Sequence, residues 1–155
     1  MDPNLMARYR ADLAAVRAAQ AARRSPQENA WGDFLRSLPW QWHATLNIPK
    51  RVPIEQIPQL WQGLIEAMES DRERQSDLPA IWIYSLEQRP RTAIHALVAR
   101  IAGVPYSHAI RTWKRVGGGW AHVTEYNPAL GGHYRLARNE VRRSDAWFRN
   151  APRSP

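Results

Sequence analysis

Two hydrophobic periodicities alternate along this chain, and their order constrains its fold more than any other feature. In WQWHATLNI, residues 40–48, apolar side chains occupy every second position, which is typical of a half-buried strand. In residues 53–70 the apolar side chains instead have the three- and four-residue spacing of an amphipathic helix. The same patterns predict strands at residues 40–48, 80–87, 93–100 and 120–126, and helices at residues 53–70, 106–116 and 134–143.

These elements follow one another in the order strand, helix, strand, strand, helix, strand, with one helix after them. The order favours an α+β domain of ferredoxin-like topology, a split βαβ unit with a four-stranded antiparallel sheet and helices on one face. The domain is predicted to span residues 39–148. Residues 1–38 are predicted to be a helical extension, in which Ser25, Pro26 and Glu28 mark the start of a second helix. The extension either packs on the domain or forms a homo-oligomer with other copies of the chain.

Length and composition exclude several classes of protein. The chain has 155 residues and no cysteine, so it suits a single domain without disulfides, thiolate metal sites or cysteine nucleophiles. No apolar run reaches the length of a membrane span, and the N-terminus lacks the hydrophobic block of a signal peptide. We therefore expect a cytoplasmic protein with no membrane partner.

The positive charge is concentrated in one half of the chain. Residues 1–80 contain ten Lys and Arg against ten Asp and Glu, whereas residues 81–155 contain twelve against four, so the second half carries the whole net charge of +8. A segregated positive field favours a polyanionic partner, and nucleic acid before membrane, because no basic amphipathic anchor accompanies it. The alternative is a basic face that serves only solubility.

Polar side chains gather on the sheet face that the predicted helices leave open. Alternation assigns to this face His43, Thr45, Asn47, Ser85, Glu87, His95, His122 and Thr124. Imidazole and carboxylate groups together suit Mg²⁺, Mn²⁺ or Zn²⁺. The candidate metal ligands are therefore Glu87, His95, His43 and His122. The alternative is a solvated face on which the histidines have no ligand.

Four short stretches resemble the catalytic domain of rolling-circle replication initiators and relaxases, the endonucleases named for a His-hydrophobe-His motif. WHATLNI resembles the first strand of that family, and YSLEQ puts Glu87 at the position of the family's acid. AIHALVA puts His95 at the second histidine of the motif, and GGHYRLARNE puts Tyr134 at the position of the tyrosine nucleophile. The resemblance covers about residues 40–143.

The resemblance implies an enzyme that nicks single-stranded or hairpin DNA. A divalent cation, Mg²⁺ or Mn²⁺, would polarise the scissile phosphate while Tyr134 attacks it, leaving a 5′-phosphotyrosine link, and Arg138 would stabilise the charge. Two signature positions differ, because Ala93 replaces the first histidine and Ala137 replaces a lysine that the family often has. The residues left to complete the metal site are His43, His122 and His133.

Two groups of cations on predicted helices are candidate contacts to DNA phosphates. They are Arg111, Lys114 and Arg115 on the helix at 106–116, and Arg135, Arg138 and Arg142 on the helix at 134–143. Cations arranged in this way contact phosphates without reading base sequence. The alternative for each group is an ordinary solvated helix face.

Three functions are compatible with these observations. The first is a metal-dependent DNA-nicking enzyme, which the clustered histidines and Tyr134 favour. The second is a nucleic-acid-binding or regulatory protein of the same fold without catalysis, which Ala93 and Ala137 favour. The third is a small phage or plasmid module whose charge serves a protein partner.

Overall fold

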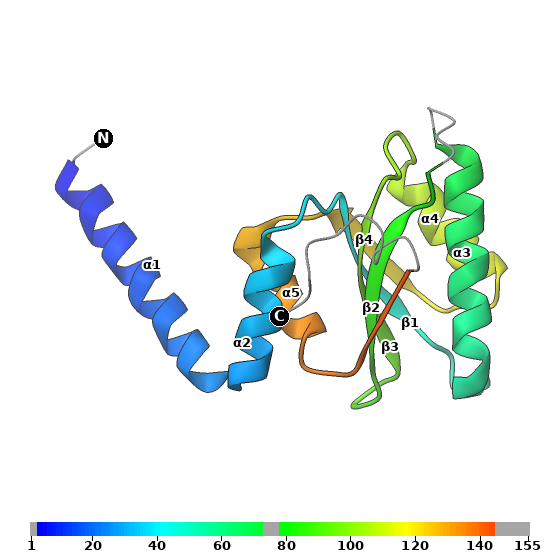
Figure 1. Ribbon diagram of the computed structural model, residues 1–155, viewed down its shortest axis with the longest axis horizontal. Helices are drawn as coiled ribbons and strands as arrows, with labels where there is room; N and C mark the ends of the chain where they lie inside the picture. The colour runs from blue at the N-terminus through cyan, green and yellow to red at the C-terminus, as the bar shows by residue number, and fades with distance from the viewer. Residues whose placement is uncertain (1–2, 73–77, 145–155) are drawn as a thin grey trace.

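The computed structural model describes residues 3–72 and 78–144, which form an α+β protein with N-terminal helices and a five-stranded antiparallel sheet (Figure 1). The strands are β1 (Trp42–Asn47), β2 (Ile81–Glu87), β3 (Ala93–Ala99), β4 (Ala121–Glu125) and β5 (Val141–Arg143). The helices are α1 (Pro3–Arg23), α2 (Pro26–Arg36), α3 (Ile57–Asp71), α4 (Tyr106–Arg115) and α5 (Gly132–Leu136), with 3-10 turns η1 (Ile54–Gln56) and η2 (Pro128–Leu130). The strands are ordered β4-β1-β3-β2-β5 across the sheet.

The central strand β3 brings polar residues from three strands together. It pairs antiparallel with β1 on one side and β2 on the other, and His95 lies opposite both Thr45 and Ser85. In the pair of β1 with β4, Thr45 also lies opposite His122. Every residue of β3 is buried, so the strand is covered on both faces of the sheet.

The helices α3 and α4 cover the first face of the sheet. Their side chains, among them Trp61, Met68 and Trp113, pack on the strand residues Leu46 and Ile94 in the larger core. The alternating pattern of the sequence correctly assigned this face to the core, because side chains two apart on a strand point the same way.

The second face is covered too, which corrects the prediction of helices on one face only. Leu35 of α2 and Leu136 of α5 form a smaller core with Ile83 and Leu97 of the sheet, and all four are fully buried. In Figure 1, α2 and α5 lie side by side on the side of the sheet opposite α3. A face that carries these apolar residues must be covered to keep them from water, so the polar site predicted on an open face lies beside a second helical layer.

The end of the described chain differs from the predicted helix at residues 134–143. Helix α5 ends at Leu136, and residues 141–143 form β5, which pairs antiparallel with β2 and gives the sheet a fifth strand instead of four. Arg142 therefore lies opposite Tyr84 on a strand and does not continue the cation row of α5. The reason is that β5 satisfies hydrogen-bonding groups at the free edge of β2, a tertiary interaction that overrides local helix preference.

Helix α1 differs from the other long helices because it buries none of its residues. It extends away from the sheet in Figure 1, and α2, which begins with Ser25 accepting a hydrogen bond from the Glu28 amide, joins it to the rest. No helix among residues 3–72 and 78–144 is long and apolar enough to cross a membrane. The predicted domain end at residue 148 lies outside the described residues.

Candidate nucleic-acid interface

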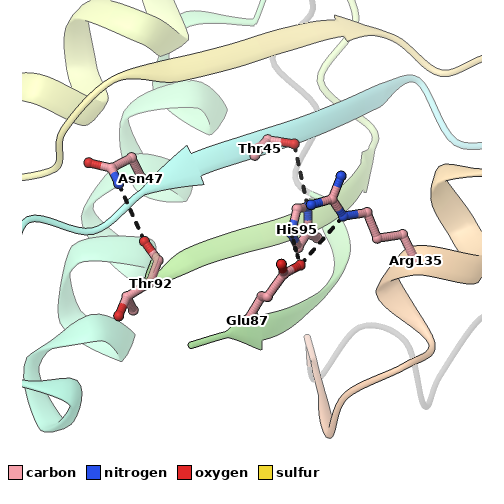
Figure 2. A network of polar contacts seen from close by, with 6 residues as sticks. All are labelled: Thr45, Asn47, Glu87, Thr92, His95 and Arg135. Atoms are coloured by element: carbon pink, nitrogen blue, oxygen red, sulfur yellow. Dashed lines mark hydrogen bonds and ion pairs between the residues drawn. The ribbon is translucent and has the colours of Figure 1, made fainter. Parts of the chain in front are cut away.

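Glu87 and His95, predicted as metal ligands, are joined directly to each other. The Nε2 atom of His95 lies 2.7 Å from Oε2 of Glu87, and Nδ1 of the same ring lies 3.4 Å from the Thr45 hydroxyl (Figure 2). Arg135 of α5 reaches the same carboxylate oxygen, with its Nε 3.4 Å away. His95 is 1 % exposed and Glu87 is 24 % exposed, so the network lies at the border of the buried layer.

The charges of this network follow from its surroundings. Burial and the nearby Arg135 lower the pKa of His95, although Glu87 opposes them, so the imidazole is neutral at pH 7. Burial would raise the pKa of Glu87, but the hydrogen bonds from Arg135 and His95 and the charge of Arg135 outweigh it and lower that pKa. An ionised carboxylate only accepts hydrogen bonds, so Nε2 of His95 carries the proton and donates it to Glu87. The Nδ1 atom is then the acceptor for the Thr45 hydroxyl.

This arrangement does not fit a metal ion. A ligand set must turn several lone pairs toward one point, whereas both nitrogens of His95 are engaged and the carboxylate of Glu87 accepts from His95 and Arg135. In the part of the chain that the structure describes, no three metal-ligating side chains lie together. Of the other two predicted ligands, His43 is half-buried and His122 is exposed on the edge strand β4.

Helix α5 begins directly over His43. A Cβ atom on Gly132 would lie 2.7 Å from the imidazole, so only glycine allows this approach. Burial lowers the pKa of His43, as do the nearby His95, His122 and Arg135. The next residue, His133, is fully buried, bonds to the Tyr126 hydroxyl through Nδ1, and has its pKa lowered by burial to about 4. His43 and His133 are therefore both neutral at pH 7.

Tyr134, the predicted nucleophile, points toward the N-terminal helices. Its hydroxyl donates a hydrogen bond to Asp33 of α2, and its ring packs so closely on Gly32 that a Cβ there would lie 2.0 Å from the ring. The guanidinium of Arg24 lies over the ring, with Cζ 3.5 Å from the ring centroid. Burial and the bond to Asp33 raise the pKa of Tyr134, so the hydroxyl keeps its proton.

Six arginines line two adjoining hollows beside Tyr134. We call this region the arginine cleft; its cations are Arg17, Arg23, Arg24, Arg36, Arg135 and Arg138. One hollow has a volume of about 380 Å³ and the other about 420 Å³, and both are lined by the end of α1 on one side and by Leu130 and Gly131 on the other. Arg138 pairs with Glu28 at 3.6 Å and Arg135 with Glu87, while Asp33 takes the Tyr134 hydroxyl. Six guanidinium groups thus face three carboxylates.

The predicted phosphate contacts are divided between the two sides of the molecule. Arg111, Lys114 and Arg115 are exposed on α4, which packs on the first face of the sheet, whereas Arg135 and Arg138 lie with α5 over the second. Four cations of the cleft come from residues 1–38. The sequence-based prediction did not include them, because residues 1–80 contain as many acids as bases and so show no net charge. A signal was present, because Arg10, Arg17 and Arg24 recur every seven residues and so lie on one side of a helix.

Comparison with protein-family models, with curated proteins and with solved structures finds no match to this chain.

Proposed function

We propose that this protein is a cytoplasmic DNA-binding protein that holds the phosphates of single-stranded or hairpin DNA in the arginine cleft and does not cleave them. The observation that carries the proposal is the convergence of six arginines on two adjoining hollows. Guanidinium groups bind phosphate through two parallel hydrogen bonds and stay charged at any physiological pH. The net charge of +8 adds attraction at longer range.

The surroundings of the predicted catalytic residues support binding without cleavage. A nucleophile is helped by a lowered pKa, whereas the pKa of Tyr134 is raised, and the Asp33 carboxylate bound to its hydroxyl would repel a phosphate from that oxygen. The implied Mg²⁺ or Mn²⁺ could bind His95 only if that imidazole released Glu87 from Nε2 or Thr45 from Nδ1. With Ala93 at the position of the first histidine, the strand offers no ligand in exchange.

We also propose that the fold is of the ferredoxin-like type, as the element order suggested. The order β4-β1-β3-β2, with α3 and α4 crossing one face, supports this assignment, and β5 with α2 and α5 is then an addition to it. In this proposal the addition has a function, because its two helices carry Tyr134 and the cleft cations Arg36 and Arg135.

The test compares two triple variants that remove the same charge from opposite sides of the sheet. The first replaces Arg17, Arg23 and Arg36 of the arginine cleft by Gln; the second replaces Arg111, Lys114 and Arg115 of α4 by Gln. Affinity for a labelled single-stranded oligonucleotide is measured by fluorescence anisotropy over a range of salt concentrations. The cleft variant should lower the salt slope by about two, since each lost phosphate contact contributes about 0.7.

The α4 variant is the matched control, because it has the same net charge and should keep most of the slope. If both variants lose the same affinity and salt slope, the overall positive field of the protein accounts for the binding, and the proposed role of the cleft is refuted. A wild-type protein that binds no DNA even at low salt would refute the whole proposal and favour a protein partner.

Cleavage is tested separately by incubating the protein with labelled single-stranded DNA and Mn²⁺. The proposal expects no covalent adduct after denaturing electrophoresis. An adduct that Tyr134→Phe abolishes would show instead the nicking enzyme that the sequence resemblance implies.

We further propose that copies of the chain associate through α1. Leu5, Tyr9 and Val16 are exposed on this helix at spacings of four and seven residues, so they form one apolar stripe. Such a stripe on a helix that buries nothing of its own is suited to pairing with a second copy.

A further inference from the structure

We infer that the stacked pair of Arg24 and Tyr134 is a platform for an unpaired nucleobase, so that the arginine cleft selects single strands over duplexes. This inference rests on the proposed function and names the feature of the nucleic acid that the cleft recognises. It starts from the fact that the same two residues, Arg24 and Tyr134, line both hollows.

The first step concerns the geometry of the stack. With Cζ of Arg24 only 3.5 Å from the ring centroid, an edge-on guanidinium would drive a nitrogen into the ring, so the two planes lie nearly parallel. The Arg24 side chain is held there, because its Nε donates to Oδ1 of Asn29 at 2.9 Å, and Asn29 in turn donates to the carbonyl of Ala21. The platform is therefore formed before any ligand arrives.

The second step concerns what holds the aromatic ring under Arg24. The Tyr134 ring packs against Gly32, which leaves no room for a side chain there, and its hydroxyl is bound to Asp33. On another side, the Tyr134 ring lies 4.3 Å from the buried ring of His133, measured between centroids. A ring fixed on these sides keeps the guanidinium plane above it in one orientation.

The third step concerns the ligand. Nucleobases stack on aromatic rings and on guanidinium planes, and every base presents a suitable π-face. Arg17 and Arg36 line one hollow and Arg135 and Arg138 the other, so phosphates on either side of a stacked base would each meet cations. A base pair inside a duplex has both faces covered by its neighbours, so the bases within a duplex cannot use the platform, whereas an unpaired base can turn a face to it.

The experiment measures how much of the affinity comes from bases. An oligonucleotide and a matched strand with abasic sites carry the same phosphates, so the ratio of their dissociation constants isolates stacking. We expect the wild-type protein to bind the intact strand about tenfold more tightly. Arg24→Lys keeps the charge and loses the plane, so the ratio should fall to about one.

Arg17→Lys is the matched control, because it changes the cleft in the same conservative way and should alter both affinities by the same factor. A second readout uses 2-aminopurine in the strand, whose fluorescence should be quenched by the wild-type protein and recover with Arg24→Lys. Thermal unfolding checks that the variants are folded. If Arg24→Lys is not folded, the wild-type ratio and quenching decide the question.

The outcomes separate this inference from the proposed function. A wild-type ratio near one, with clear binding to both strands, overturns the platform and leaves the phosphate cleft standing. If the ratio of the two dissociation constants stays high in Arg24→Lys, the platform is also overturned. The base would then stack on another aromatic residue, such as Trp120, which is 47 % exposed. Absence of binding to either strand refutes the proposed function, and the platform with it.

Discussion

Single residues at the junction of α2 and α5 set how closely the second helical layer approaches the sheet. Gly32 leaves room for the ring of Tyr134, and Gly132 leaves room for the ring of His43. Neither position needs an unusual backbone conformation; each needs the absence of a Cβ atom. The tyrosine that the sequence resemblance marks as a nucleophile thus has a structural position, held between two helices.

Replacing Gly32 by Ala tests this close packing. Alanine favours a helix interior by about 1 kcal/mol over glycine, but its Cβ would lie 2.0 Å from the Tyr134 ring. We expect the clash to dominate and the free energy of unfolding to fall by about 1–3 kcal/mol, the usual cost of overpacking. Chemical denaturation of wild type and variant provides the measurement.

Gly63→Ala is the control for Gly32→Ala, because it also lies inside a helix and gains the same propensity. Its Cβ would lie 3.3 Å from a Val116 methyl group, a contact that a small side-chain shift relieves. The control should be neutral or stabilising. If both variants are stabilised, the α2–α5 contact is looser than the structure shows.

The buried His133 makes stability depend on pH. Its pKa falls from 6.5 to about 4 on folding, chiefly through burial, so the unfolded state binds the proton more readily. The penalty is absent above pH 6.5, grows as pH falls toward 4, and reaches on the order of 3 kcal/mol. Denaturation of wild type and His133→Gln between pH 7 and pH 4 should show a shallower loss in the variant, by about that amount. If the free energy of unfolding falls equally with pH in wild type and variant, His133 is accessible to protons in the folded state.

At the scale of elements, the two cores make α2 part of the domain and leave α1 outside it. Leu35 of α2 is fully buried with Leu136, whereas Leu5 of α1 is 62 % exposed. A segment that looks like one helical extension in the sequence is therefore two elements with different energetic roles.

Leu35→Ala and Leu5→Ala measure that difference. The first leaves a cavity between α2, α5 and the sheet and should cost about 2–5 kcal/mol of stability. The second removes an exposed side chain and should stay within about 0.5 kcal/mol of wild type. Thermal or denaturant unfolding of both variants measures the two changes in stability. If both changes are small and equal, α2 does not contribute to the cooperative fold.

The sequence predicted the elements of the first face better than those of the second. Alternation in residues 40–48 and helical spacing in residues 53–70 are local patterns, so β1, α3 and their shared core could be inferred from them. The layer of α2 and α5 depends on contacts across about a hundred residues, such as Tyr134 with Asp33. Ile83 and Leu97 alternate with the polar residues of the second face, a sign of a covered face that the prediction of an open face did not use.

The candidate site was predictable to the same extent. Neighbouring strands brought Glu87 and His95 together, as their places in the sequence suggested, and the pairing of the strands explains why. That Arg135 would share the carboxylate, and that arginines of α1 would join those of α5, depended on how α5 docks. Local patterns cannot report the position of a helix of five residues.

At the scale of the whole molecule, the two proposed interactions should respond to salt in opposite ways. The described part of α1 carries Arg8, Arg10, Arg17 and Arg23 against Asp12, so two copies of this helix repel each other. Salt screens that repulsion while the apolar stripe remains, and it weakens binding to phosphates. Sedimentation velocity should therefore show self-association rising with salt as DNA binding falls.

Tyr9→Gln combined with Val16→Gln removes two of the three side chains of the stripe and should abolish the association without changing DNA affinity. Association that weakens as salt rises would point to ion pairs and contradict a role for the stripe.

Helix α1 buries none of its residues, which leaves its backbone open to proteases. Trypsin, which cuts after arginine, meets Arg8, Arg10 and Arg17 on a helix with no core contacts to protect it. Limited digestion would shorten the chain from that end while the sheet and its two cores stayed intact. The trimmed product would lose one wall of the arginine cleft, and the proposed binding of nucleic acid should weaken although the rest of the fold is preserved.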